Sequence, residues 1–271
     1  MATAHQPGTI PVRKMNFEFK DVPKDYLNGN LPFSNFFNGM NLLFPEGERF
    51  FMHAVRDGLN KLDNPDDDLK QRAKGFYGQE AQHSLEHLKY FDILDQNGYT
   101  FREELAKFDR FIIKMRKKLP VSLRLSMTAG AEHLTAIAAQ VALKDQDVVD
   151  GHPVMRDLMQ WHAIEEIEHK AVAYDVYANL SGNYFLRQLG YLAAVLVVLG
   201  YSFKFAYQFM RQDGYSRRSA RKAMKGSLRS VLKRNSYLMK DFLAYLKPGF
   251  HPNQIDDERL IKEARVDLAA Y

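Results

Sequence analysis

The sequence of 271 residues contains no cysteine. Disulfide scaffolds, thiolate zinc sites, iron–sulfur clusters and cysteine nucleophiles are therefore excluded, and any metal ion must be held by His, Asp or Glu. Residues 1–20 lack the apolar core of a secretory signal, so a cytoplasmic protein is expected. Disorder as the main state is excluded because 46% of the residues are hydrophobic, which suffices for a real core.

The positive charge of the chain is local. The formal net charge is +5, but residues 211–234 contain nine Lys or Arg and one Asp, a net charge of +8 for that segment. The remaining residues therefore sum to −3. A generally basic nucleic-acid binder is a poor description of this chain, and the basic segment needs its own explanation.

The pattern of apolar residues, prolines and glycines predicts an all-α protein. Residues 1–35 form an extended arm with room for one short strand, and from Pro45 onward the apolar period is helical. The predicted helices cover approximately residues 45–64, 66–97, 101–119, 120–145, 153–181, 188–203 and 216–246, followed by a short helix after Pro252. We interpret residues 36–185 as a helical bundle and residues 186–271 as an apolar and basic helical appendage.

Two Glu-x-x-His motifs carry the chemistry: Glu80 with His83, and Glu166 with His169. Residues three apart on a helix share a face, so each pair can hold one metal ion. A helix with a single carboxylate in an apolar stripe precedes each motif, with Glu48 before the first and Glu132 before the second. Buried carboxylates cost several kcal/mol each unless paired or coordinated, so four together indicate bound cations.

This pattern resembles the ferritin-like di-iron carboxylate proteins, whose four-helix bundle supplies one Glu from each of two helices and Glu-x-x-His from each of the other two. A closer resemblance is to a bacterial family described as predicted metal-dependent hydrolases. It is carried by the runs FPEGERF (44–50), QEAQH (79–83) and WHAIEEIEHKAVAYD (161–175). The resemblance covers roughly residues 35–190.

The resemblance implies a fold, a set of ligands and a pair of metal ions. It implies a ferritin-like four-helix bundle that binds two ions, iron first, with manganese or zinc as alternatives. The six ligands that it implies are Glu48, Glu80, His83, Glu132, Glu166 and His169. Glu165 is the candidate catalytic acid that supports a ligating imidazole. The Arg common in the second motif is replaced by Glu168, which leaves the supporting network open.

Several neighbouring residues have two interpretations. Glu46 competes with Glu48, and His87 and His162 are either additional ligands or polar residues just outside the ligand shell. Thr135 is a candidate catalytic residue beside an oxygen-binding position, or it bonds the preceding helical turn. His133 is expected to point away from the metal ions because it directly follows Glu132.

The C-terminal part leaves three roles open. The apolar run at 189–203 has about 15 residues, short of the roughly 20 needed to span a bilayer. It is either a helix buried across the bundle or part of a module, residues 189–246, that contacts an anionic membrane surface through the +8 segment. The second role would place the protein at the inner membrane face. Contact with nucleic acid is disfavoured because no recognition motif is present.

From these features we expect a di-iron oxidoreductase that activates dioxygen on a small or hydrophobic organic substrate. The first alternative is a metal-dependent hydrolase in which a metal-bridging water attacks an ester, amide or phosphate. The second is a non-enzymatic metal-binding protein. A monomer or dimer is expected, since iron storage requires a shell of many subunits.

Overall fold

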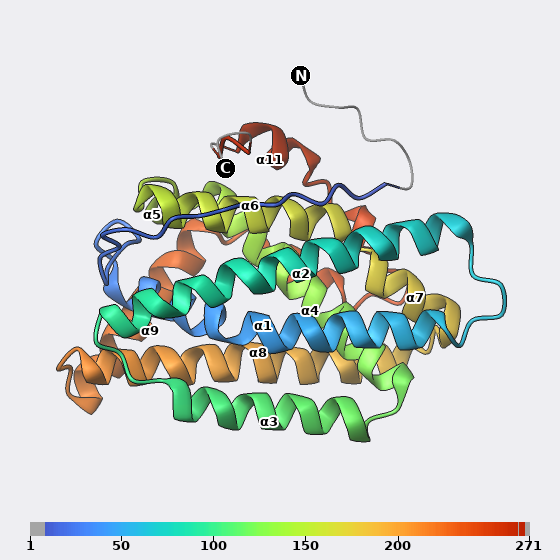
Figure 1. Ribbon diagram of the computed structural model, residues 1–271, viewed down its shortest axis with the longest axis horizontal. Coiled ribbons are helices and arrows are strands. Elements are labelled where there is room, and N and C mark those ends of the chain that lie inside the picture. Colours follow the sequence, from blue (N-terminus) through green and yellow to red (C-terminus); the bar gives the residue numbers. More distant parts are fainter. Residues whose placement is uncertain (1–8, 265, 269–271) are drawn as a thin grey trace.

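The computed structural model describes residues 9–264 and 266–268, and within these ranges it contains helices and no strand (Figure 1). The helices are α1 (Leu31–Leu59), α2 (Asp67–Gln96), α3 (Arg102–Lys118), α4 (Val121–Lys144), α5 (Gln146–Val149), α6 (Pro153–His169), α7 (Val172–Leu180), α8 (Tyr184–Gln212), α9 (Arg217–Arg234), α10 (Leu238–Ala244), the 3-10 turn η1 (Pro252–Gln254) and α11 (Glu258–Glu263). The all-α prediction is confirmed. Residues 1–8 of the predicted arm, and residues 265 and 269–271 of the predicted appendage, lie outside the described residues.

The first helix begins fourteen residues before the predicted start at Pro45, at Leu31. The side chain of Asn30 caps it by accepting a hydrogen bond from the Phe33 N–H, and Pro32 occupies the first turn. Pro45 lies inside α1, where it removes one N–H from the helical ladder. The prediction was wrong because this capped start outweighs the local signal of Pro45.

Three other predicted helices differ in extent. The segment 153–181 divides into α6 and α7, and α8 is longer than the predicted 188–203 because the Asn183 side chain caps it by accepting from the Leu186 N–H. The predicted helix 216–246 divides into α9 and α10 at Asn235. The side-chain amide of Asn235 donates to the Val231 carbonyl and to Asp145, which ends α9. The starts and ends of α2, α3 and α4 agree with the prediction within two residues.

The N-terminal arm forms no strand over its described part but lies extended across α2 and α6 (Figure 1). Met15 and Phe17 point inward, and the Phe17 ring packs 5.6 Å from that of Trp161. A Cβ atom at Gly75 would lie 2.6 Å from the Ile10 Cβ, so glycine lets the arm approach α2 closely. The predicted extended arm is therefore present, but its buried Met15 and Phe17 pack on helices, and the predicted short strand is absent from its described part.

Four helices surround a polar layer between two hydrophobic clusters. Residues of α1, α2, α4 and α6, such as Phe50 and Trp161, belong to one cluster. The second cluster contains other residues of α1, α2 and α4, such as Phe76 and Ala129, together with residues of α7. The predicted ligands lie in the layer between these clusters, so the apolar packing that stabilises the fold also removes them from water.

Candidate metal centre

The structure brings the six predicted ligands together from four helices. Glu48 lies on α1, Glu132 on α4, and the two Glu-x-x-His pairs lie on α2 and α6. None of the six residues is more than 4% exposed. The helix faces that carry these six residues point into the same interior layer, as expected from the sequence.

The two imidazoles face a shared group of carboxylates. The His169 Nε2 lies 3.2 Å from the Glu132 Oε2, 3.5 Å from the Glu166 Oε2 and 3.9 Å from the Glu80 Oε1. The His83 Nδ1 lies 3.5 Å from the Glu80 Oε2 and 3.8 Å from the Glu166 Oε1. Two groups can therefore hold a metal ion, Glu80 with Glu132 and His169, and Glu80 with His83 and Glu166.

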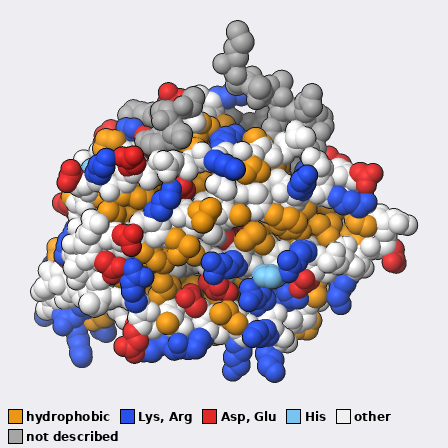
Figure 2. Space-filling model, in the orientation of Figure 1, with side chains coloured by type: hydrophobic (Ala, Val, Ile, Leu, Met, Phe, Trp, Pro, Cys, Tyr) orange, Lys and Arg blue, Asp and Glu red, His pale blue; other side chains and the backbone are white. Residues whose placement is uncertain are grey.

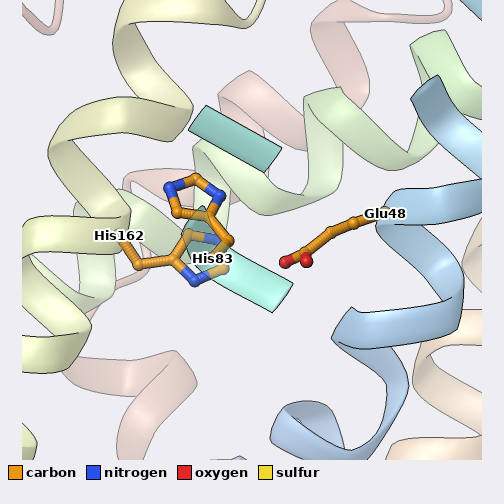
Figure 3. A group of neighbouring side chains, drawn as sticks. All are labelled: Glu48, His83 and His162. Atoms are coloured by element: carbon orange, nitrogen blue, oxygen red, sulfur yellow. The ribbon is translucent and has the colours of Figure 1, made fainter. Parts of the chain in front are cut away.

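A third group adds Glu48 and His162. Figure 3 shows Glu48 pointing from α1 toward the rings of His83 and His162, and these three residues can also hold a metal ion. The two rings stack with their centroids 4.0 Å apart. Glu46 instead pairs with Arg49 and Arg116 at the rim, so Glu48 is the residue of this pair that reaches the interior layer.

Each motif supports the imidazole of the other. The His83 Nε2–H donates to the Glu165 carboxylate at 3.0 Å, and the His169 Nδ1–H donates to the Gln79 Oε1 at 2.8 Å. Glu165 and Gln79 occupy the same position, immediately before the Glu of each Glu-x-x-His. These bonds fix the tautomer of each ring, and they leave the His83 Nδ1 and the His169 Nε2 facing the carboxylates.

The N-terminal arm completes this support with a residue that the sequence analysis missed. Arg13 donates to Glu165 at 3.0 Å and to both oxygens of Glu168 at 2.8 and 2.7 Å, while Gln79 donates to the Pro11 carbonyl and to Glu168. The sequence offered one signal for this residue: Glu168 stands where the second motif usually has Arg, and an additional acid there requires a cation from another part of the chain.

Replacing Arg13 by methionine is expected to weaken metal binding about 10- to 100-fold. Burial raises the pKa of Glu165, and the Arg13 cation opposes that rise, so its loss favours a protonated Glu165 that holds the His83 ring less firmly. Metal affinity can be measured by competition with a chelator. Arg102→Met, which breaks an exposed pair with Asp95, is the matched control and should leave affinity unchanged. Equal affinities for both variants would contradict this role of the arm.

The remaining candidates lie at the edge of the polar layer. The His87 Nε2–H donates to the His162 Nδ1 at 2.6 Å, and the His162 Nε2–H donates to the Glu166 Oε1 at 2.7 Å. The Thr135 hydroxyl donates to the Glu132 carbonyl at 3.0 Å, the predicted bond to the preceding turn, and it also lies within hydrogen-bond distance of Glu166. His133 points away, with its Nε2–H bonded to the Asp241 carbonyl.

Without metal, the carboxylates of the layer compete for protons. Burial and the neighbouring acids raise the pKa of Glu48 and Glu80 well above the ordinary value, and burial raises the pKa of Glu132 to about 7. For Glu166 the burial penalty is outweighed by His169 and by the bond from His162, so its pKa lies well below the usual range. Burial and the nearby His162 hold the pKa of His83 well below its ordinary value. The layer is therefore built to exchange protons for cations.

Two narrow cavities reach the layer. The first, of about 60 Å³, lies between α1, α3, α4 and α8, and its lining is apolar apart from Glu48 and Thr135. The second, of about 40 Å³, is bordered by His87, His162 and Glu166. Thr135 borders both cavities, which places its hydroxyl where they approach the carboxylates.

Comparison with known protein families matches residues 11–256 to the family described as "Predicted metal-dependent hydrolase". No curated protein and no solved structure matches the chain. The match includes the arm from Pro11, all six predicted ligands and helices α1 to α10. A buried layer of Glu and His residues that can hold a metal ion agrees with this family description. The chain belongs to the family of predicted metal-dependent hydrolases.

Proposed function

We propose that the protein is a hydrolase that binds two metal ions in a ferritin-like four-helix bundle formed by α1, α2, α4 and α6. The order of donors along the chain supports this, since a helix with one Glu precedes a helix with Glu-x-x-His twice. His83 would hold one ion and His169 the other. Glu80 and Glu166 each lie within 4 Å of both imidazoles, which suits carboxylates that bridge two ions.

The residues fit such ions because their buried polar atoms lack other partners. Seven atoms that face the layer accept or donate no hydrogen bond among the described residues: the Glu48 Oε1, both carboxylate oxygens of Glu80 and of Glu132, the His83 Nδ1 and the His169 Nε2. Leaving buried polar groups unsatisfied costs about 1–3 kcal/mol each. Oxygen and nitrogen donors of this kind suit iron, manganese or zinc.

The observation that carries hydrolysis is the chain of bonds from Glu166 through His162 to His87. When bound, the ions supply a Lewis acid and lower the pKa of coordinated water. In these bonds both histidines donate toward Glu166, so the three side chains can relay a proton to the Glu166 Oε1 for the leaving group while the His87 Nδ1 takes up the replacement proton. Burial and His162 hold the pKa of His87 well below its ordinary value, so its ring is neutral, and its Nδ1 has no hydrogen-bond partner among the described residues.

The cavities favour a hydrophobic substrate. Met40, Phe44 and Thr135 border both, so an ester or amide with an apolar chain would place that chain against Met and Phe and its polar group against the Thr135 hydroxyl. Burying each CH₂ group there contributes about 0.8 kcal/mol. Sugars would lose their hydrogen bonds to water in the same space and are excluded.

Oxidation with dioxygen at two iron ions is the second candidate. The observation favouring it is the donor set, four carboxylates and two imidazoles, which suits iron. Narrow apolar cavities also admit a small apolar gas while excluding bulk water. The same ligands serve both reactions, so the metal and the need for oxygen discriminate between them.

The two candidates are separated by loading metal-free protein with manganese, zinc or ferrous iron without oxygen. Para-nitrophenyl esters of increasing acyl length are the hydrolysis probe, and an oxygen pulse followed by optical spectroscopy is the oxidation probe. Hydrolysis predicts ester turnover with manganese or zinc that is indifferent to oxygen. An optical change that needs both iron and oxygen, with no ester turnover, favours the second candidate, and inactivity in both arms contradicts both.

His162→Gln tests the proton path itself. The variant is expected to lower ester turnover about 100-fold or more, because a positioned acid or base typically contributes 10²–10⁴-fold. Metal content should remain near wild type, because Glu166 and His83 stay in place. Unchanged turnover would contradict the path, whereas loss of metal would assign His162 to the ligand set with Glu48 and His83.

A further inference from the structure

The outer face of α8 carries an uncovered apolar stripe. Phe185, Leu189, Leu192 and Leu196 follow one another at intervals of four, three and four residues, so they lie on one side of the helix. They are 80%, 55%, 55% and 65% exposed. A contiguous apolar surface of this kind marks an interaction site, since scattered single side chains would not keep helical spacing.

The opposite side of α8 is fixed to the bundle. A Cβ atom at Gly190 would lie 1.9 Å from the Ser126 Oγ, and one at Gly130 would lie 2.7 Å from the Tyr191 Cα. α8 is long and apolar enough to cross a membrane by length and composition, with a mean hydropathy of 1.7 over 18 residues. Only 33% of these 18 residues are buried. The helix is therefore longer than the apolar run at 189–203 indicated. Because one side packs on α1 and α4, α8 can present only its outer side to a partner.

The neighbouring helices extend the apolar surface. α10 lies against the N-terminal half of α8, where Tyr191 donates to the Phe242 carbonyl and Gln188 to the Tyr245 carbonyl. The exposed apolar side chains of α9, α10 and the residues around α10 are Leu228, Leu232, Tyr237, Met239, Leu243 and Leu246. The outer layer formed by α8, α9 and α10 thus exposes apolar side chains along its length.

The same layer is positively charged. α9 contains eight Lys or Arg and no acidic residue. Arg234 pairs with Asp145 and Asp147, whereas the other seven make no ion pair with any described residue. All seven are exposed. Lys and Arg side chains also line the lower edge of the face in Figure 2, the side on which α3 lies in Figure 1, so the charge there is separate from that of α9.

Charge and hydrophobicity together select the partner. A second copy of the chain would bring like charges near each other, and nucleic acid would leave the apolar stripe in water. An anionic bilayer satisfies both, because its head groups attract Lys and Arg and its acyl boundary accepts Leu and Phe. We propose that the outer face of α8, α9 and α10 docks the protein on an anionic phospholipid bilayer.

This orientation has a consequence for the cavities. Ala194, Val197 and Val198 of α8 line the first cavity, while Leu192 and Leu196 of the same helix face outward. Docking would therefore place the first cavity directly behind α8, one helix away from the lipid. Membrane binding itself does not depend on the proposed reaction, so it can be tested without any activity assay.

Sedimentation of the full chain with vesicles tests the proposal. Vesicles of phosphatidylcholine and phosphatidylglycerol should bind the protein at about 0.05 M salt and release it near 0.5 M, since salt screens exposed charges. Vesicles of phosphatidylcholine alone should bind far less. Lys222→Glu with Lys225→Glu should weaken binding about 30-fold, because each basic residue contributes about a factor of five.

Matched variants separate docking from general charge. Lys61→Glu with Lys74→Glu changes two exposed lysines, one just after α1 and one on α2, and should leave binding unchanged. Figure 1 shows α2 on the other side of α1 from α8. Leu192→Ser with Leu196→Ser should weaken binding by about tenfold or more, since it removes two exposed apolar anchors. Absence of binding at low salt, or equal loss in both lysine pairs, overturns the proposal. So does a dimer in light scattering that the Leu192→Ser, Leu196→Ser protein loses, or tighter binding to duplex DNA than to vesicles.

Discussion

Replacing His83 or His169 by alanine is expected to cost the protein at least one metal ion and about 4 kcal/mol of stability. Each imidazole is a neutral donor, and its loss leaves carboxylates of the buried layer without a shared cation. A ligand at about 1,000 times its Kd stabilises the folded state by about 4 kcal/mol, which disappears with binding. For a chain of this size the Tm should fall by about 10 °C.

Metal analysis and calorimetry of the purified variants measure both effects. His133→Ala is the control, because this buried ring bonds the Asp241 carbonyl and packs near Tyr245 rather than facing the carboxylates. It should lower stability while leaving the metal content intact. Full metal occupancy in both His83→Ala and His169→Ala would contradict the assignment of the layer as a metal centre.

The contribution of Glu132 to the stability of the metal-free protein is expected to fall as the pH rises from about 4.5 to 7. The buried His83 and His87, whose pKa values are lowered, act in the opposite direction, so the contribution of Glu132 is measured against Glu132→Gln. Glu132 has a folded pKa of about 7 against an ordinary value of 4.5, so the folded state holds a proton that the unfolded chain has released. Glu48 and Glu80 shift in the same direction. Glu132 alone contributes about 3 kcal/mol to this fall.

Metal-loaded protein should show the opposite trend, because binding requires ionised carboxylates and strengthens as protons leave. Thermal unfolding with and without a chelator between about pH 5 and pH 8 therefore gives curves that diverge at high pH. Glu132→Gln is the most informative variant, since its neutral amide removes the charge from a buried position. Metal-free Glu132→Gln should be more stable than metal-free wild type at pH 8, although it binds metal poorly. The same pH dependence of stability in metal-free wild type and metal-free Glu132→Gln would contradict a proton held by Glu132.

The predicted ligands were accessible from the sequence because their geometry is local. Glu80 and His83 share a helical face whatever the rest of the chain does, and so do Glu166 and His169. The absence of cysteine limited the donors to carboxylates and imidazoles. Glu132 stood out because residues 125–139 around it are mostly small or apolar, a setting that a solvated carboxylate does not need.

The helix boundaries show where local signals compete. Asp66 and Gly98 mark the ends of α2 without rivals, whereas Pro45 suggested a start that the Asn30 cap and Pro32 overrode. The division at Asn235 depends on a bond to Asp145, 90 residues earlier in the chain. Sequence spacing does not encode which distant group will receive such a bond.

By itself, the sequence determined the all-α class and the helix faces from which the six Glu and His side chains project, because helical periodicity is a property of neighbouring residues. Only the tertiary structure decided the support around them. Arg13 meets Glu165 across 152 positions, and Gln79 meets His169 across 90. It also decided which side of α8 is buried, because an apolar helix looks the same in sequence whether its partner is protein or lipid. Close packing of Gly130 and Gly190 against neighbouring backbone, and of Gly39 on α1 against Ser202 on α8, selected that side.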